Sequence, residues 1–242
     1  MVETVVVTGA TQGIGLATAR MLSEKGVCVV GIARSKPKQE FPGEFYAANL
    51  SDRSETAQVI EEINAHHRVD GIVNNVGLNI IEPLGSVDLD HFDRVIDLNV
   101  RASIQITQLL LPGMRERQYG RIVNLSSRGA LGREGRTSYS AAKAGLVGIT
   151  RTWALELAHE GITANVVSPG PTATDMFRRN NLSGPQAAEN KKRFLADVPM
   201  DRFGEVDEIA YGICFFLDRR ASFITGQVLN VCGGSSVGLS AL

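Results

Sequence analysis

The sequence predicts an α/β fold in which one doubly wound parallel sheet of about seven strands carries helices on both faces. Two observations lead to this prediction. Short apolar runs rich in β-branched residues alternate along the chain with longer segments of helical periodicity. Runs that are apolar throughout are typical of strands covered on both faces, as they are in parallel sheets. A chain of 242 residues with 43% hydrophobic and 21% charged residues can also fill the core of one such domain.

Seven apolar runs supply the expected strands, at residues 5–7, 27–32, 44–48, 71–73, 121–125, 163–167 and 227–231. Between them lie candidate helices, the first at residues 13–25. In a later one, apolar residues recur at steps of three and four, at Leu146, Ile149, Trp153 and Leu157. No repeat and no Pro/Gly/Ser-rich linker divides the chain, so we expect a single domain over residues 1–242. Residues 175–203 form the least regular segment, and its length indicates a functional or mobile element rather than a simple loop.

Charge and composition exclude several classes of protein. The formal net charge is -1, whereas nucleic-acid binding needs a basic surplus. No stretch of about 18 uncharged apolar residues is present, so we expect no membrane span. The three cysteines are far apart and form no C-x-x-C pair, and the four histidines show no metal-ligand spacing, so we expect neither a disulfide framework nor a metal site. This cysteine usage suits a reducing compartment and predicts a cytoplasmic protein.

A glycine-rich turn follows the first expected strand, with Gly9, Gly13 and Gly15 at the point where the first helix begins. Glycines let the backbone approach a pyrophosphate, and the helix N-terminus supplies free N–H groups and a positive dipole end. A bare tight turn is the competing interpretation. The position directly after the first strand favours a dinucleotide site and a Rossmann-type sheet.

Tyr139 and Lys143 are four residues apart and therefore share one face of a helix. A free tyrosine titrates near pH 10, which is about three units too high for efficient proton transfer at neutrality. A neighbouring ammonium, together with an oxidised nicotinamide, would stabilise the phenolate and lower that pKa. Tyr139 would then act as the acid/base of a carbonyl reduction or an alcohol oxidation. On its own, such a pair is more often an ordinary surface pair, so its weight comes from the preceding strand and the upstream nucleotide loop.

These motifs, taken in order, are similar to those of the classical short-chain dehydrogenase/reductase family. The shared features are the Gly-x-x-x-Gly-x-Gly loop, Asn-Asn-Val-Gly at residues 74–77, Asn99, Ser126 thirteen residues before Tyr139, Tyr-x-x-x-Lys, Pro169-Gly170, Thr174 and Ile-Thr-Gly at residues 224–226. The resemblance covers nearly the whole chain. Much of the sequence is similar to the 3-oxoacyl-acyl-carrier-protein reductases of that family. It implies that residues 175–203 form a substrate lid.

The resemblance also implies catalytic roles for Asn99, Ser126, Tyr139 and Lys143. Ser126 would hold the substrate oxygen, with Ser127 as its rival, and Asn99 would position a water next to Lys143. Lys143 would also bind the nicotinamide ribose. A related enoyl reductase group spaces its tyrosine and lysine more widely, so the spacing here favours carbonyl/alcohol chemistry over carbon–carbon double-bond reduction.

We expect NADP(H) rather than NAD(H) as the cofactor. NAD sites commonly place an acid at the end of the second strand, where this chain has Arg34. A guanidinium can pair with a 2′-phosphate through a fork of donors, although a solvated Arg34 remains the alternative. Asn49 replaces the family's aspartate near adenine. The cofactor-binding residues implied are Gly9, Thr11, Gln12, Gly13, Ile14, Gly15, Arg34, Ser35, Asn49, Leu50, Asn75, Gly77, Tyr139, Lys143, Pro169, Gly170, Thr172 and Thr174.

The sequence thus predicts an NADP(H)-dependent oxidoreductase that interconverts a carbonyl and a secondary alcohol in a small molecule, such as a 3-oxoacyl-thioester or keto-acid reductase. Two alternatives remain open: an NAD-linked alcohol, polyol or sugar dehydrogenase, and a non-catalytic dinucleotide-sensing regulator. The resemblance also implies a homotetramer, or a dimer, that packs through residues 104–114 and 141–157.

Three arginines lie between the catalytic serine and the catalytic helix: Arg128, Arg133 and Arg136. Guanidiniums near a cleft would attract and orient a carboxylate or phosphate. Arg128 is a candidate substrate-binding residue, with a solvated position equally open. For Arg133 and Arg136 we favour solvation, or pairing with Glu134 and other acids across a subunit interface.

Overall fold

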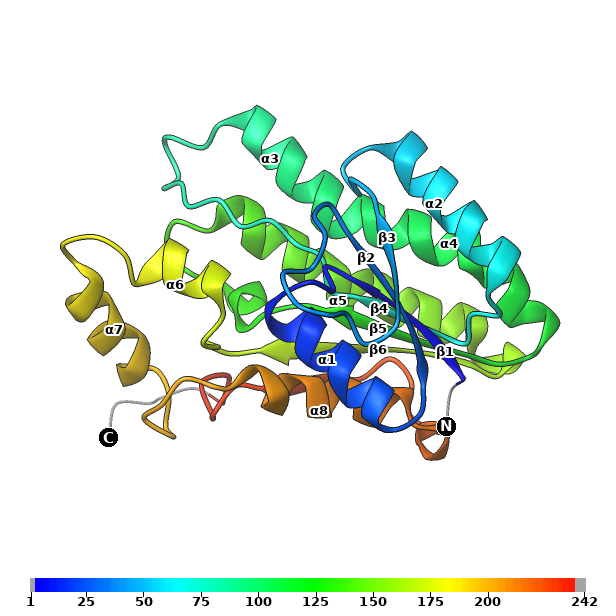
Figure 1. Cartoon of the computed structure of the whole chain (residues 1–242). Helices are drawn as coiled ribbons and strands as arrows, with labels where there is room; N and C mark the ends of the chain where they lie inside the picture. The colour runs from blue at the N-terminus through cyan, green and yellow to red at the C-terminus, as the bar shows by residue number, and fades with distance from the viewer. Residues whose placement is uncertain (1–2, 238–242) are drawn as a thin grey trace.

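The computed structural model describes residues 3–237, and these form one seven-stranded parallel sheet with helices on both faces (Figure 1). The strand order is β3-β2-β1-β4-β5-β6-β7, and every neighbouring pair is parallel. The strands are β1 (Thr4–Thr8), β2 (Cys28–Ala33), β3 (Glu44–Ala47), β4 (Gly71–Asn74), β5 (Gly120–Leu125), β6 (Ile162–Pro169) and β7 (Val228–Val231). The predicted fold class and all seven predicted strands are confirmed.

Eight α-helices connect or follow these strands within the described residues. They are α1 (Gly13–Glu24), α2 (Arg53–His66), α3 (Leu89–Ile96), α4 (Ala102–Glu116), α5 (Thr137–Leu157), α6 (Asp175–Asn181), α7 (Ala187–Ala196) and α8 (Val206–Leu217). Shorter helical turns lie at Asp97–Arg101, Arg128–Leu131, Ala158–Glu160 and Arg219–Ala221. In residues 3–237 we find no helix whose length and apolarity would let it cross a membrane.

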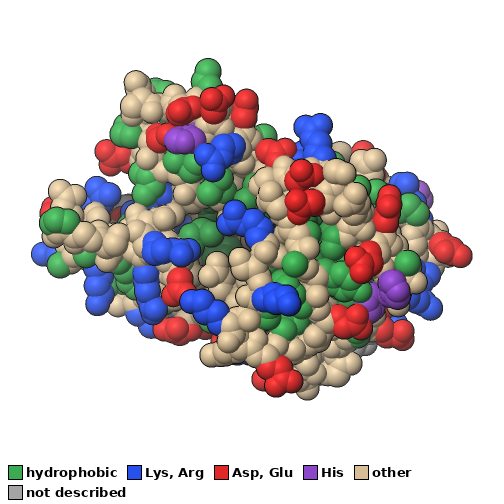
Figure 2. Space-filling view, turned by 45° about the horizontal axis from the view of Figure 1, so that its top comes forward, with side chains coloured by type: hydrophobic (Ala, Val, Ile, Leu, Met, Phe, Trp, Pro, Cys, Tyr) green, Lys and Arg blue, Asp and Glu red, His purple; other side chains and the backbone are tan. Residues whose placement is uncertain are grey.

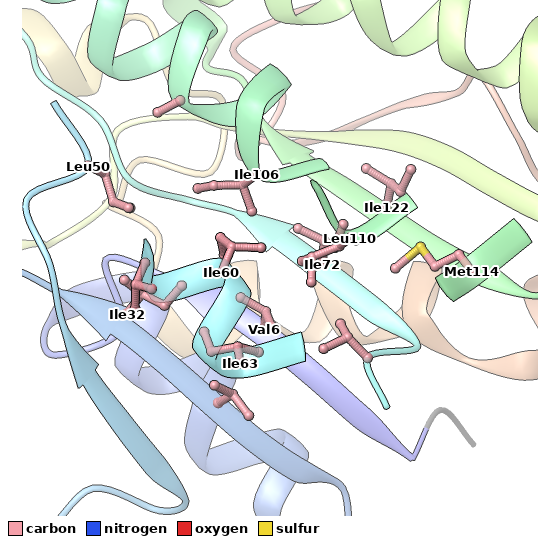
Figure 3. Packing of buried hydrophobic residues seen from close by; sticks show 14 of the residues in the cluster. Val6, Ile32, Leu50, Ile60, Ile63, Ile72, Ile106, Leu110, Met114 and Ile122 are labelled. Carbon is pink, nitrogen blue, oxygen red and sulfur yellow. The ribbon is translucent and has the colours of Figure 1, made fainter. Parts of the chain in front are cut away.

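Side chains that alternate along each strand divide the core into two layers. On one face, Val6 packs with the buried side chains of α2 and α4, among them Ile60, Ile63 and Ile106 (Figure 3). On the other face, Val5 and Val7 pack with buried residues of α1 and α8. Because both faces are covered, the central strands are apolar at nearly every position, which explains the continuous apolar runs of the sequence.

The sheet reverses its direction of winding between β1 and β4. From β1 the chain moves outward to β2 and β3, and it then returns to β4 and continues through β5, β6 and β7 on the other side. Open parallel sheets bind ligands at such a switch point, outside the carboxyl ends of the strands. The loops after β1, β4, β5 and β6 therefore meet where a site is expected.

The irregular segment at residues 175–203 contains α6 and α7, which lie together at one side of the sheet (Figure 1). Three aromatic rings hold it together. The ring of Phe177 lies 4.9 Å from that of Phe194 and 5.2 Å from that of Phe203, both edge-on. The segment is thus an organised pair of short helices with its own apolar contacts, next to the loops at the carboxyl edge.

Candidate active site

The glycine-rich turn after β1 depends on its glycines, as Gly9 and Gly15 show. Gly9 has a φ of +64°, which favours glycine because it carries no Cβ. A Cβ on Gly15 would lie 2.3 Å from the carbonyl oxygen of Gly9, a distance that no real side chain tolerates. Helix α1 begins at Gly13, and no side chain caps its N-terminus. Its first N–H groups are therefore left for a bound anion such as a phosphate.

A hydrogen-bond network joins this turn to the loop after β4. The hydroxyl oxygen of Thr8 accepts from the backbone N–H groups of Asn75 and Val76, each at 3.0 Å. The Asn75 amide donates to the carbonyl oxygens of Thr8 at 2.8 Å and Gly9 at 3.3 Å. Asn75 thus fixes the shape of the glycine turn, which is a positioning role in addition to the cofactor contact expected from the sequence.

The strand ends beyond the turn carry the residues expected around the adenosine. Arg34 and Ser35 are exposed directly after β2, and Arg34 makes no ion pair within residues 3–237. Asn49 uses its amide oxygen to accept from Ser51 N at 3.3 Å, so that oxygen is already engaged within the chain. Leu50 is buried.

The loop after β6 approaches the glycine turn from the other side. Pro169 ends β6, and a Cβ on Gly170 would lie 2.7 Å from the Cα of Cys232. Thr174 caps α6 by accepting from Phe177 N at 3.1 Å, while Thr172 is buried. An ideal Cβ on Gly13 would lie 3.4 Å from the Thr174 methyl carbon. The turn after β1 and the loop after β6 therefore border the same space.

Tyr139 and Lys143 lie in the first two turns of α5, where the sequence placed them. The Lys143 ammonium nitrogen is 5.7 Å from the centre of the Tyr139 ring, and it donates to the Leu125 carbonyl oxygen at 2.8 Å. Burial lowers the pKa of Lys143 to about 7. Burial also raises the pKa of Tyr139, partly offset by a hydrogen bond with Ser127 and by the charge of Arg136. The sequence predicted a lowered pKa for Tyr139. Without a bound cofactor, the effect of burial is larger and the pKa of Tyr139 is raised instead.

The two adjacent serines after β5 differ in their contacts. Ser126 is buried, its N–H still pairs with Val167 of β6, and its hydroxyl donates to the Lys143 carbonyl oxygen at 2.7 Å. The Ser127 hydroxyl is hydrogen-bonded to Tyr139 and accepts from Gly129 N at 3.0 Å. The geometry does not support Ser126 as the substrate-binding serine, because its hydroxyl is committed to the backbone of α5. Ser127, the rival in the sequence, faces the acid/base.

Asn99 lies in a π-helical turn, Asp97–Arg101, between α3 and α4. Its amide nitrogen donates to Val95 O at 2.8 Å and to Leu78 O at 2.9 Å, and its amide oxygen is buried with no partner within residues 3–237. A Cβ on Gly77 would lie 2.7 Å from that oxygen and 3.4 Å from the Lys143 ammonium. The unpaired oxygen and Lys143 thus border one small space beside Gly77, which suits the water that the sequence predicts.

The three arginines of the β5–α5 connection have different surroundings. Arg128 donates to the carbonyl oxygens of Ser235 at 3.2 Å and Gly132 at 3.4 Å. The Arg133 guanidinium lies 3.7 Å from the centre of the Phe194 ring and 3.9 Å from Asp197. Arg136 is only 6% exposed and donates to the Asn181 amide oxygen of α6 at 2.6 Å. The solvated position favoured for Arg136 is therefore wrong, because α6 covers it.

Sequence reasoning assigned no role to Asn181, which lies in a segment without a recognisable motif. The one available signal is that Asn181 ends a short helix which directly follows the loop after β6.

This donor set fits a nicotinamide dinucleotide. The glycine cradle and uncapped helix offer N–H groups to phosphates, and the Lys143 ammonium and the unpaired Asn99 oxygen lie beside Gly77. A doubly wound sheet with such a cradle at its switch point and a tyrosine–lysine pair beside it defines the class of dinucleotide-dependent oxidoreductases.

Comparison with known proteins gives the family. A family model described as enoyl-(acyl carrier protein) reductase matches residues 9–236. The 3-oxoacyl-(acyl-carrier-protein) reductase FabG of Thermotoga maritima is 35% identical over 240 residues, which cover 94% of this chain and 95% of that protein. The corresponding Escherichia coli reductase is 35% identical over 237 residues, with 94% and 95% covered. The chain belongs to the short-chain dehydrogenase/reductase family and is an oxidoreductase.

Solved structures agree with this assignment. The aldohexose dehydrogenase of Thermoplasma acidophilum has a TM-score of 0.93 at 26% identity, and the match covers 99% of this chain and 96% of that protein. A gluconate 5-dehydrogenase from Burkholderia cenocepacia, in complex with NADP and tartrate, has a TM-score of 0.89 at 25% identity, with 98% and 96% covered.

Proposed function

We propose that this protein is an NADP(H)-dependent oxidoreductase that interconverts a carbonyl and a secondary alcohol in a small molecule, with Tyr139 as the acid/base. The observation that carries the proposal is the convergence of Tyr139, Lys143, Ser127 and the unpaired Asn99 oxygen at the edge of the glycine cradle. The bound nicotinamide would supply or accept the hydride.

Each of these side chains has a distinct task in the proposed reaction. In the direction of reduction, the Tyr139 hydroxyl donates its proton to the substrate oxygen, and the Ser127 hydroxyl donates a hydrogen bond to the same oxygen. The Lys143 ammonium stabilises the resulting phenolate. A water held by the Asn99 oxygen beside Lys143 returns the proton from solvent. In oxidation the same groups act in reverse.

Two findings favour a carbonyl over a carbon–carbon double bond as the reacting group. Tyr139 and Lys143 are one helical turn apart, which is the close spacing expected of the carbonyl-reducing members. The relatives at 35% identity are named as 3-oxoacyl reductases, although the matching family model carries an enoyl reductase description. A 3-oxoacyl thioester or a keto acid is therefore the substrate class that we put first.

The cofactor preference rests on the end of β2. Arg34 is exposed there without an ion-pair partner in the described chain, and residues 33–36 contain no acid to repel a 2′-phosphate. The Burkholderia structure holds NADP, which is compatible with this choice. The homotetramer and the cytoplasmic location expected from the sequence remain part of the proposal, as does the role of residues 175–203 as a substrate lid.

Oxidation of a sugar or sugar acid is the second candidate, because the structural neighbours include an aldohexose dehydrogenase and a gluconate 5-dehydrogenase. The use of NAD in this reaction is the alternative left open by the sequence. A non-catalytic regulator is disfavoured, since Tyr139 and Lys143 are both present and lie one turn apart on α5.

One set of measurements tests the proposal. Wild-type protein is assayed with keto acids, 3-oxoacyl thioesters, sugars and sugar acids, each with NADP(H) and NAD(H). Tyr139→Phe should retain cofactor affinity and lose most turnover, because only the transferable proton is removed. Arg34→Asp should shift preference from NADPH towards NADH by adding a repelling charge. Equal wild-type affinities for the two cofactors would overturn the NADP assignment, and near-normal kcat in Tyr139→Phe would overturn the acid/base role.

A further inference from the structure

Arg136 carries a buried charge that the chain itself does not neutralise. Its side chain is 6% exposed at the start of α5. One guanidinium nitrogen, Nη2, donates to the Asn181 amide oxygen at 2.6 Å, whereas the other, Nη1, is buried with no hydrogen-bond partner in the described residues. Asn181 is neutral, and no carboxylate within residues 3–237 forms an ion pair with Arg136. A buried guanidinium that stays charged but unpaired is costly, and such groups are rarely kept without a counter-ion.

The acids of this region are already engaged elsewhere. Asp197 pairs with Arg133 at 3.9 Å, and Glu134 reaches Arg193 at 4.0 Å. Glu82, whose backbone bridges to Arg136, directs its carboxylate to His91 at 2.6 Å. The missing counter-ion of Arg136 is therefore not available from a neighbouring side chain in the described chain.

Arg136 also differs from the other two arginines of the same connection. The Arg133 guanidinium stacks on the Phe194 ring and lies close to the Asp197 carboxylate, so it has both an aromatic and a charged partner. Arg128 donates to two backbone carbonyl oxygens near the chain's C-terminal region. Of the three, Arg136 is the one that combines deep burial with a free donor.

The place of Arg136 connects it to the reaction. It precedes Tyr139 by three residues, and residues at that spacing on a helix lie about 5–6 Å apart at their Cβ atoms. The charge of Arg136 lowers the pKa of Tyr139, against the larger effect of burial, so the two groups are near enough to interact. Asn181, at the end of α6, holds the guanidinium from the side of the 175–203 segment. Arg136 thus connects the start of the catalytic helix with the segment that we propose as the lid.

We propose that Arg136 binds the carboxylate of a short keto acid or hydroxy acid whose reacting carbon lies next to Tyr139. This inference rests on the proposed oxidoreductase function and narrows its substrate class. A carboxylate would give Nη1 an acceptor and cancel the buried charge by a charge-assisted hydrogen bond. Since Arg136 and Tyr139 are one helical turn apart, the anionic group lies within a few bonds of the reacting carbon. The phosphate of a long carrier arm is too far from its reacting carbon to fill this position.

The surface around the segment is suited to the approach of an anion. Lys and Arg side chains (blue) gather on the left of Figure 2, where Figure 1 places α6 and α7. Lys191, Lys192 and Arg193 lie on α7, and Arg178 and Arg179 lie on α6. A local basic field of this kind raises the concentration of anionic substrates near the site, although the whole chain has a net charge of -1.

The test compares an acid with its uncharged isostere. Acetoacetate and acetoacetamide, and pyruvate and pyruvamide, are assayed with wild-type protein and NADPH, and their binding to the NADP⁺-loaded protein is measured by calorimetry. We expect the preferred acid to bind, and to react in kcat/KM, about 10- to 100-fold better than its amide. Arg136→Gln should remove this preference by lowering kcat/KM for the acid far more than for the amide, mainly through KM, and Arg136→Lys should restore part of it. Arg193→Gln, which removes one charge of the basic field on α7 but no direct partner of the carboxylate, should keep most of the preference.

The outcomes separate the two proposals. If the wild-type protein reduces amides or other uncharged ketones but binds both acids no better than their amides, the carboxylate site is refuted and the oxidoreductase function stands. If it turns nothing over but binds an acid through Arg136, the site stands and the proposed function fails. Loss of the preference in Arg128→Gln instead of Arg136→Gln would overturn the assignment. Equal losses of kcat on acid and amide in Arg136→Gln, with a shifted pH profile, would show that Arg136 acts only on Tyr139.

Discussion

The two serines that follow β5 are adjacent in the sequence, but their hydroxyl groups make different contacts. Ser126 continues the pairing of β5 with β6, and its hydroxyl is used to hold the backbone of α5. Ser127 is the first residue free of the sheet, and its hydroxyl meets Tyr139. The lysine one turn along α5 is held by the end of the same strand, through Leu125. The residues at and just after the end of β5 therefore contact both Tyr139 and Lys143.

This difference predicts opposite effects of two alanine substitutions. Ser127→Ala should lower kcat by about 100- to 1000-fold, because it removes a hydrogen-bond donor to the charge that develops on the substrate oxygen. Ser126→Ala should cost about 1 kcal/mol of unfolding free energy through the lost bond to the Lys143 carbonyl and should affect kcat less. Steady-state kinetics and urea unfolding of both variants distinguish the roles. The reverse pattern, with Ser126→Ala stable but inactive, would return the role to Ser126.

Lys143 makes stability depend on pH in a defined direction. Its pKa is lowered by burial to about 7 from the usual 10.5, so between these values the unfolded chain binds a proton that the folded chain has released. Stability linked to this group therefore rises with pH across that window, and below about pH 7 the folded protein bears the full cost of a buried ammonium.

We therefore expect Lys143→Met to stabilise the cofactor-free protein by on the order of 1 kcal/mol near pH 6, with a smaller gain near pH 9, while turnover is lost. Thermal unfolding of both proteins at the two pH values measures this difference. A variant that is less stable than the wild type at the lower pH would contradict the assignment of a strained, buried lysine.

Among the elements, two local irregularities create binding capacity. Helix α1 starts without a side-chain cap, whereas α2 and α3 are capped by Asp52 and Asp88. The π-helical turn at Asp97–Arg101 leaves the Asn99 oxygen unpaired, and single π-turns of this kind are frequent at functional sites. In both places a polar group has no side-chain partner in the described residues, and we expect a bound phosphate at α1 and a water at Asn99.

The close approach of Gly15 to Gly9 predicts that Gly15→Ala damages the nucleotide turn. The added Cβ would meet a backbone oxygen at 2.3 Å, so the turn must shift, and we expect a loss of about 1–3 kcal/mol in stability together with weakened NADPH binding. Gly204→Ala is the matched control, since its nearest neighbour would be 3.7 Å from the new Cβ. Both variants are compared by cofactor titration and thermal unfolding. Normal NADPH affinity in Gly15→Ala would mean that the turn does not contact the cofactor.

At the scale of the whole molecule, large apolar side chains are exposed on both faces of the sheet. Leu155 of α5 is 84% exposed, and on the opposite face Tyr211 of α8 is 69% exposed; Phe223, before β7, is fully exposed. We expect these side chains to be covered by other copies of the chain in the homotetramer that the sequence predicts. Two separate faces allow two different two-fold contacts, which build a tetramer, whereas one face allows only a dimer.

We therefore expect a homotetramer in solution, and two substitutions should each split it into dimers by breaking a different contact. Leu155→Glu should break the contact through α5, and Phe223→Asp should break the contact near β7, each giving dimers because a charge would be buried in an apolar interface. Light scattering after size-exclusion chromatography gives the masses, and NADPH titration checks that each variant is folded. A monomeric wild-type protein at assay concentration would contradict this expectation.

The sequence by itself determined the fold class, the nucleotide turn and the position of the Tyr139–Lys143 pair. These features are local: strand and helix periodicities follow from backbone geometry, and the glycines of the turn and the four-residue spacing lie within short stretches of chain. The strands, the nucleotide turn and the tyrosine–lysine pair can therefore be predicted from the sequence, and they occur in the structure in the same order.

Only the tertiary structure decided which of the two serines meets Tyr139, that the Asn99 oxygen is unpaired, and that Arg136 is buried without a counter-ion. Ser126 and Ser127 are chemically identical, and the choice depends on how far β5 remains paired with β6. The burial of Arg136 depends on Asn181, which lies 45 residues further along the chain. Contacts of that range are fixed by how the elements pack, and no local periodicity encodes whether a charged side chain will find a partner there.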